Sequence, residues 1–110
     1  MNALVTNPLV SIVIPVYNRE LYIEDAIRSA ISQTYQNIEI IIVDNCSTDS
    51  TWDILNEWEK KDNRIKIFQN DSNIGPVLNW NECFRHASGE YIKILWSDDW
   101  ISHKFVEKCL

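Results

Sequence analysis

Glycine is scarce in this sequence of 110 residues, which contains only Gly75 and Gly89. Two glycines at that separation supply neither the GxGxxG fingerprint of dinucleotide-binding domains nor the GxxxxGKS/T loop of P-loop proteins. A glycine-rich backbone cradle for phosphate is therefore excluded. If the chain binds an anionic ligand, side chains or a metal ion have to supply the positive charge.

Basic clusters, cysteine pairs and long apolar runs are also absent. The formal net charge is −6 and no run of Lys and Arg occurs, so we expect no nucleic acid partner, because phosphate backbones are bound by clustered basic residues. Cys46, Cys83 and Cys109 have no CxxC spacing. We expect neither a disulfide framework nor a zinc site, and reduced cysteines fit a cytoplasmic location. No segment approaches the roughly 20 apolar residues of a membrane span, and residues 1–10 lack the pattern of a signal peptide.

Four short segments rich in β-branched residues are predicted to be strands. Hydrophobic residues make up 45% of the chain and aromatic residues 11%, which is enough for a packed core. The near-continuous apolar character of the segments is typical of strands buried on both faces of a parallel sheet. The predicted strands are residues 9–16, 38–43, 65–68 and 91–95.

Segments with helical spacing of apolar residues lie between these strands, over residues 20–33, 50–61 and 76–88. Strands and helices that alternate with short connections imply right-handed crossovers and a parallel sheet. We therefore predict an α/β fold with a mainly parallel sheet and flanking helices. The whole of residues 1–110 is expected to form one domain.

Single residues are predicted to mark the ends of the first elements. Pro15 is expected to end the first strand near its own position, because it lacks the N–H of a ladder hydrogen bond. Asn18 is a candidate N-cap for the first helix. Ser50 and Asp53 resemble a capping box at the start of the second helix.

The third helix has a predicted inward face and a predicted end. Val77, Trp80, Phe84 and Ala87 recur at helical spacing, so they are expected to face the sheet. Gly89 is expected to close this helix as a C-cap.

The last segment, residues 102–110, is predicted to begin a further helix. Its apolar residues Phe105, Val106 and Leu110 face nothing that follows in the chain. We therefore expect the chain to be the front part of a longer protein.

Polar segments follow all the predicted strands. Ligands of open parallel sheets bind outside the carboxyl ends of the strands, so these segments are expected to form the site. Asp44 and the pair Asp98 and Asp99 lie where strands end, and such oxygen ligands suit Mg²⁺ or Mn²⁺ bridging to phosphate oxygens. A metal in that place stabilises charge that develops on a diphosphate leaving group. The four segments are Tyr17–Arg19, Asp44–Ser47, Asn70–Gly75 and Ser97–Trp100.

Each of these residues also has a purely structural interpretation. Asp98 and Asp99 would equally form a turn and cap the helix that follows. Asp44 would equally serve in a strand-end turn. Tyr17 would be an aromatic residue of the rim, and Arg19 a solvated residue at a helix start. The residues alone leave these alternatives open.

Two longer stretches carry the pattern of a known family. Residues 10–51 begin with VSIVIPVYNRE and end with VDNCSTDST, and residues 70–100 run from NDSNIG to LWSDDW. Both resemble family 2 glycosyltransferases, whose GT-A fold is the Rossmann-like fold of nucleotide-diphospho-sugar transferases. The likeness extends from about Val10 to Leu110. It implies metal-assisted, inverting transfer of a sugar from a nucleotide-diphosphate donor to an acceptor hydroxyl, with this chain as the donor-binding half.

For the nucleotide, the resemblance implies a base site lined by Pro15, Tyr17 and Asn18. Asp44 matches the acid that hydrogen-bonds the base, commonly uracil, and Asn73 lies in a stretch that matches a loop near the nucleotide. The expected donor is therefore a UDP-sugar, and the expected acceptor is a saccharide or a lipid-linked acceptor. Any association with a membrane would come from a part of the protein outside this chain.

For the diphosphate, Ser97-Asp98-Asp99 matches the DxD-type acidic motif of the family. The resemblance implies that Asp99 binds the metal, Mn²⁺ or Mg²⁺, and that Asp98 contacts the ribose or the same metal. The general base is expected after Leu110, so the catalytic residue is unknown and the fragment alone is expected to be inactive.

Two departures from the family pattern affect these expectations. Trp96 stands where many relatives have an acid, so fewer carboxylates hold the metal. Asn45 and Cys46 stand where relatives often have Asp and Gly, and the local turn is expected to change because cysteine tolerates positive φ poorly.

Two other functions remain as alternatives. Trp96 favours a catalytically inactive nucleotide-sugar-binding module of the same fold. A flavodoxin-like or receiver-type domain also places acids at strand ends, but receivers need one after the first strand, where this chain has Pro15, Val16 and Tyr17. We rank that alternative third.

Overall fold

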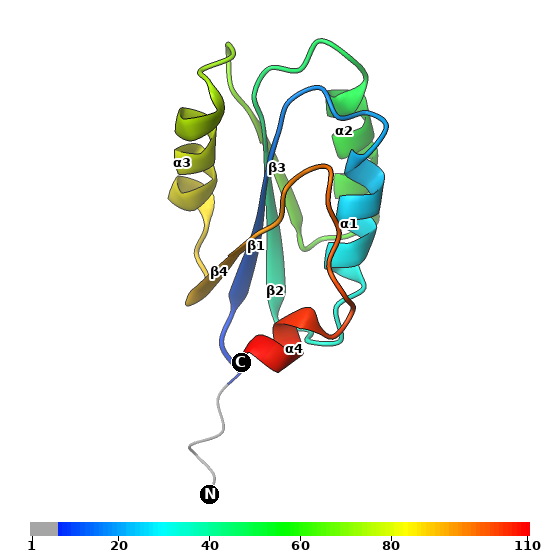
Figure 1. Cartoon of the computed structure of the whole chain (residues 1–110), viewed down its shortest axis with the longest axis vertical. Coiled ribbons are helices and arrows are strands. Elements are labelled where there is room, and N and C mark those ends of the chain that lie inside the picture. Colours follow the sequence, from blue (N-terminus) through cyan, green and yellow to red (C-terminus); the bar gives the residue numbers. More distant parts are fainter. Residues whose placement is uncertain (1–6) are drawn as a thin grey trace, which may run out of the picture.

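The computed structural model describes residues 7–110, in which strands and helices alternate along the chain. The four strands form one parallel sheet in the order β3-β2-β1-β4, with helices on both faces (Figure 1). The predicted parallel sheet is confirmed, and each strand end falls within one residue of its predicted position. The elements are β1 (Val10–Val16), α1 (Ile23–Ile31), β2 (Ile38–Asp44), α2 (Thr51–Lys61), β3 (Ile65–Gln69), α3 (Pro76–His86), β4 (Tyr91–Ile94) and α4 (Phe105–Cys109).

The two central strands, β1 and β2, are buried along their whole length. Alternate residues of a strand point to opposite faces of the sheet, and both faces are covered here. Ile12 and Ile40 belong to the larger core cluster, together with residues of α1 and α2. Val13 and Ile41 belong to a smaller cluster with Cys83 of α3. This two-sided burial explains why the sequence of both strands is almost continuously apolar.

β1 ends at Val16, one residue beyond Pro15, as predicted. The carbonyl of Val13 accepts the N–H of Leu95, whereas the carbonyl of Val16 accepts the N–H of Asn45 in the chain after β2. Odd-numbered residues of β1 therefore direct their backbone groups toward β4. Since the pairing with β4 ends at Val13 and Ile94, the missing N–H of Pro15 removes no ladder hydrogen bond.

The face that α3 turns to the sheet differs from the predicted one. Val77 is 65% exposed and Phe84 is 37% exposed, whereas Asn79 and Cys83 are buried. The amide of Asn79 donates a hydrogen bond to the carbonyl of Val43 in β2. A buried polar contact thus sets the rotation of α3, and apolar periodicity could not reveal it.

The predicted caps of α1 and α2 are wrong. The residue before α1 is Tyr22, and neither Tyr22 nor Ser50 makes a side-chain capping hydrogen bond. Asp49 instead accepts the N–H of Thr51 at 2.9 Å. Asn18, the predicted cap of α1, has a φ of 50° and lies in the loop that precedes the helix.

The chain after α3 reaches the amino edge of the sheet, where the strands begin. A Cβ on Gly89 would lie 2.6 Å from the Oγ of Ser11 and 2.7 Å from its backbone N. Gly89 is therefore needed for close approach to β1, and the helix that it was predicted to cap already ends at His86. Next to this contact, the carboxylate of Glu39 accepts hydrogen bonds from Ser11, Ser88 and Lys66.

The last segment packs back onto the molecule. Val106 of α4 is only 3% exposed, and Ile101 and Phe105 pack against the larger core cluster. Phe105 and Val106 thus have partners earlier in the chain, whereas Leu110 is exposed. None of the helices within residues 7–110 has the combination of length and apolar character needed to cross a bilayer.

Candidate functional site

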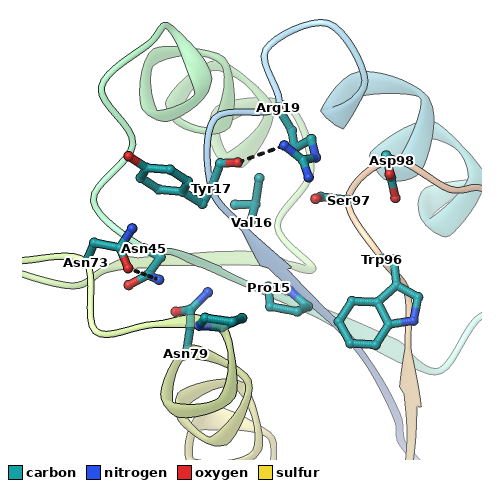
Figure 2. Close-up of a pocket in the computed structure, with 11 residues that line it drawn as sticks. Pro15, Val16, Tyr17, Arg19, Asn45, Asn73, Asn79, Trp96, Ser97 and Asp98 are labelled. Carbon is teal, nitrogen blue, oxygen red and sulfur yellow. Dashed lines mark hydrogen bonds between the residues drawn. The ribbon is translucent and has the colours of Figure 1, made fainter.

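A cavity of about 380 Å³ opens at the carboxyl edge of the sheet, where the strands end (Figure 2). Segments that follow β1, β2, β3 and β4 all contribute to its wall. This is the place where open parallel sheets bind their ligands. The residues that line it are Pro15, Val16, Tyr17, Arg19, Asn45, Asn73, Pro76, Asn79, Trp96, Ser97 and Asp98.

Four of the predicted site residues lie together around this cavity. Pro15 belongs to the end of β1, and Tyr17 follows it with its ring 37% exposed. Asn73 comes from the loop before α3, and Asp98 follows β4. Residues that are up to 83 positions apart in the sequence are thus brought to one cavity, which places polar and aromatic groups within reach of a single ligand.

Asn18 does not line the cavity, although it was predicted at the base site. Its side-chain oxygen accepts the N–H of Thr48 at 2.8 Å and the N–H of Asp49 at 3.3 Å. Its own N–H donates to the hydroxyl of Ser47 at 2.8 Å. Asn18 therefore joins the loop after β1 to the loop after β2, and these contacts hold the neighbouring Tyr17 in place.

Asp44 lies behind the wall of the cavity and is fully buried. One carboxylate oxygen accepts the N–H of Ser47 at 3.2 Å and the side-chain amide of Gln69 at 3.0 Å, and the other accepts the hydroxyl of Ser47. Both oxygens are therefore satisfied by the protein itself. Asp44 shapes the turn after β2, as its structural interpretation required.

Asp98 and Asp99 differ in their positions. Asp98 faces the cavity, whereas Asp99 is not among its lining residues and accepts the N–H of Trp100 at 2.8 Å. Within residues 7–110, no group of three or more His, Cys, Asp or Glu side chains has the arrangement of a metal site. Mg²⁺ in proteins is commonly held by one or two carboxylates together with phosphate oxygens and water. Of the two aspartates, Asp98 is the one that lies where a metal could be shared with a diphosphate in the cavity.

Arg19 is the one cationic side chain among the residues that line the cavity. Its guanidinium donates to the carbonyl of Tyr17 at 3.3 Å and to that of Asn18 at 3.2 Å. These contacts use one of its nitrogens and fold the side chain back over the loop (Figure 2). Its remaining N–H groups are available to an anion in the cavity.

Asn45, Asn79 and Trp96 also line the cavity. Asn45 lies in the predicted site segment Asp44–Ser47 without an individual role, whereas Asn79 was not predicted at the site. Asn45 is only 2% exposed and forms hydrogen bonds to the loop before α3. Trp96 is 49% exposed and contacts Trp80 edge to face, with 5.8 Å between the ring centres. The position of Asn45 directly after a strand was the one signal that could have identified it.

In the turn after β2, a residue other than glycine has the left-handed backbone conformation. Cys46 has a φ of 64°, so the expectation that cysteine would alter this conformation is wrong. The thiol of Cys46 lies 3.7 Å from the carbonyl of Asp71. The hydrogen bonds that join Asp44 to Ser47 span Cys46 and impose the conformation on a residue type that disfavours it.

Comparisons with known proteins agree with this fold. Residues 11–110 match the family model described as glycosyl transferase family 2. The chain resembles the Escherichia coli protein WfaP, named UDP-Glc:alpha-D-GlcNAc-diphosphoundecaprenol beta-1,3-glucosyltransferase. The two are 47% identical over 97 residues, and the match covers 87% of this chain and 38% of WfaP. The chain spans 41%, 36% and 38% of the length of three curated relatives that it matches.

Two solved structures have the same GT-A fold. Residues 1–349 of TarS from S. aureus, in complex with UDP-GlcNAc, superpose with a TM-score of 0.84 at 31% identity, covering 91% of this chain and 29% of that one. The mannosyltransferase PcManGT from Pyrobaculum calidifontis, in complex with GDP-Man and Mn²⁺, gives a TM-score of 0.81 at 26% identity, covering 89% and 30%. The family match over nearly the whole chain and these likenesses show that the chain belongs to glycosyl transferase family 2.

Proposed function

We propose that this chain is the donor-binding part of a glycosyltransferase that moves a sugar from a nucleotide-diphosphate sugar to an acceptor hydroxyl. The observation that carries the proposal is the single cavity at the carboxyl edge, where aromatic, amide, cationic and acidic side chains meet. The family match supports it, because solved relatives contain UDP-GlcNAc or GDP-Man. A UDP-sugar is the proposed donor.

The nucleoside is proposed to lie against Tyr17 and Pro15, with its base directed toward Asn73. Figure 2 shows Tyr17 and Asn73 on the same side of the cavity, with Arg19 and Asp98 on the other. Aromatic rings stack on nucleobases, and amides bind their polar edges. Asp44 supports this wall through Ser47, and a direct contact of Asp44 with the base requires Ser47 to release its carboxylate.

The diphosphate is proposed to lie between Arg19 and Asp98. Arg19 offers N–H donors to the phosphate oxygens, and Asp98 and Asp99 would hold Mn²⁺ or Mg²⁺ there. The bound metal supplies positive charge that stabilises the leaving diphosphate. The Mn²⁺ complex of PcManGT supports the use of a divalent metal, and leaves the choice between the two metals to experiment.

Transfer is proposed to invert the anomeric centre. A general base deprotonates the acceptor hydroxyl, the oxygen attacks the anomeric carbon, and the bond to the diphosphate breaks. We assign no residue of this chain as the base and place it in another part of the protein. WfaP, which acts on a diphosphoundecaprenol substrate, supports a lipid-linked saccharide as the acceptor.

Calorimetric titration of the full-length protein with UDP in the presence of Mn²⁺ tests the proposal. We expect saturable binding that weakens when the metal is omitted, because the diphosphate then loses a ligand. The same titration with uridine, which lacks phosphate, is the matched control. Absence of binding to every common nucleoside diphosphate would sink the proposal.

A catalytically inactive nucleotide-sugar-binding module is the second candidate. It is favoured by Trp96, which contacts Trp80 at a position where the resemblance implies an acid. Slow hydrolysis of the donor by the full-length protein, lost in the Asp99→Asn variant, would exclude it. Binding of the donor without transfer or hydrolysis would favour it.

A further inference from the structure

Gln33 lies shortly after the end of α1 and is buried, with only 2% of its surface exposed. Its side-chain nitrogen donates to the carbonyl of Ser29 at 3.0 Å and to that of Ser102 at 2.7 Å. Its side-chain oxygen accepts the N–H of Val106 at 3.0 Å. Because a carbonyl can only accept and an N–H can only donate, these partners fix the direction of the amide.

The two distant partners of Gln33 lie in α4 and in the segment that joins β4 to α4. We call that segment, residues 95–104, the acidic loop, because it carries Asp98. Figure 1 shows it leaving the end of β4 and passing beside α1 to α4. The N–H of Thr34 donates to the carbonyl of His103 in this loop at 2.7 Å. The end of α1 thus holds the far end of the acidic loop by directional bonds.

The middle of the acidic loop has no such bonds to other elements. Within the part of the chain that the structure describes, the hydrogen bonds of residues 96–101 stay inside the loop. Ile101 packs against the larger core cluster, but apolar contact is not directional. At the near end, the N–H of Leu95 donates to β1 at 2.9 Å. The place of Asp98 at the cavity therefore depends on β1 at one end of the loop and on Gln33 at the other.

We propose that Gln33 is a positioning residue that holds the acidic loop so that Asp98 faces the cavity. Gln33 is not among the residues that line the cavity, so it acts through the loop and not on the ligand. This inference rests on the proposed function and adds to it a residue that supports the diphosphate and metal site from outside. Partners that orient a metal ligand in this way commonly change metal affinity about 10- to 100-fold when they are replaced.

The Gln33→Met variant tests the proposal, because methionine keeps the approximate volume of the side chain and removes its hydrogen bonds. Calorimetry measures the affinity of the full-length protein for UDP with and without Mn²⁺. We expect the affinity with Mn²⁺ to fall about tenfold and the affinity without metal to change less than about twofold. A residue that only stabilises the fold would lower the melting temperature and leave both affinities of the folded protein unchanged.

Two results would overturn the inference. One is an unchanged affinity for UDP in the presence of Mn²⁺, and the other is an equal loss with and without the metal. Gln36→Met is the matched control, since it makes the same change at an exposed position whose side chain donates only to the carbonyl of Thr34 at 3.4 Å. The control is expected to keep both wild-type affinities.

A double variant tests whether Gln33 acts through Asp98. In protein that already carries Asp98→Asn, the added Gln33→Met change should lower the affinity for UDP with Mn²⁺ less than about twofold, because two residues of one unit are not additive. A further loss of about tenfold would show that the two residues act independently, which contradicts the proposal.

The outcomes for the wild type separate this inference from the proposed function. If the wild type binds UDP and Gln33→Met binds it equally well, the inference alone is wrong. If the wild type binds no nucleoside diphosphate, both are wrong. Should Gln33→Met fail to fold, Gln33→Asn replaces it. Asparagine keeps an amide but is one methylene too short to reach α1 and the acidic loop together, so the same loss of metal-dependent affinity is expected, and its absence would overturn the inference.

Discussion

The strands of the sheet begin at its amino edge and end at its carboxyl edge, and β2 buries one carboxylate near each. The two carboxylates have different roles. At the amino edge, Glu39 is 4% exposed, and at the carboxyl edge Asp44 is fully buried. Burial raises the pKa of Glu39, but hydrogen bonds from Ser11, Ser88 and Lys66 outweigh it and lower that pKa to about 2. The partners of Glu39 come from neighbouring strands and the chain before β4, so they bind the sheet together.

The carboxyl edge has the same kind of polar network, but its partners are loops. Asp44 holds Ser47 and Gln69, and Asn45 holds the loop before α3. These bonds join the loops to one another beside the cavity at the strand ends. A buried polar group holds in place the segments that donate hydrogen bonds to it. At one edge it fixes a closed sheet, and at the other it fixes the wall of a pocket.

Glu39→Gln is expected to have the largest effect and to act on stability alone. A lowered pKa means that the ionised form stabilises the fold above pH 4.5, and that this stability is lost as the pH falls toward 2. The shift corresponds to about 3 kcal/mol. Unfolding by urea at several pH values should show that loss between pH 5 and 2 in the wild type. The variant should be less stable at neutral pH and lose the part of this acid dependence that Glu39 contributes.

Unchanged donor affinity in folded Glu39→Gln protein is part of the same prediction, because Glu39 lies at the edge opposite the cavity. A changed affinity of the variant for the nucleotide donor would contradict the separate roles given to the amino and carboxyl edges. Glu57→Gln, which removes an exposed negative charge in α2, is the control for the altered net charge.

Gly89→Ala is expected to destabilise the amino edge by about 2 kcal/mol, since overpacking a close contact costs that much. The added Cβ would meet backbone atoms of Ser11 and Leu9, which cannot move aside as a flexible side chain would. Chemical denaturation measures the loss. Glu90→Ala, at the next and exposed position, is the control, and an equal loss there would contradict the role given to Gly89.

Asp98→Asn tests the carboxyl edge and follows from the proposed function. Removing a charge that faces the cavity should weaken UDP binding in the presence of Mn²⁺ about tenfold, or about 1.4 kcal/mol. The melting temperature should not change, because Asp98 is exposed. Binding without the metal should be affected less. A loss of stability with unchanged affinity would assign Asp98 to the fold.

Cys46→Gly is expected to give the smallest effect, a gain of about 0.5 kcal/mol. Glycine accepts the left-handed conformation of Cys46 at no steric cost, and its greater freedom in the unfolded chain offsets part of the gain. Thermal unfolding measures it. Cys46→Ser, which loses the thiol and keeps the strain, should show no gain, and an equal gain in both variants would trace the effect to the thiol.

The parallel sheet could be predicted because its cause is local. Burial on both faces makes β1 and β2 continuously apolar, and the polar residues after each strand show where each ends. Convergence of the strand exits at one edge follows from parallel order alone. Tyr17, Asn73 and Asp98 could therefore be predicted as neighbours, whereas Pro15 was placed with them by the family resemblance.

The roles of Asn18, Asn45 and Asn79 could not be predicted in the same way. Each depends on a hydrogen-bond partner 25 or more positions away in the chain, such as Thr48 for Asn18 or Val43 for Asn79. An asparagine in a sequence shows what it can donate and accept, but not what it meets. The roles given to Asp44 and Asp99 toward a ligand, and the cytoplasmic location, stay predictions.

The amino acid order by itself determined the alternation of strands and helices, because hydrophobic periodicity follows from which faces are buried. Only the tertiary structure decided which amides meet behind the pocket and which of their atoms face it. The reason is that hydrogen bonds are directional and short, so their pairing depends on where distant loops come to lie.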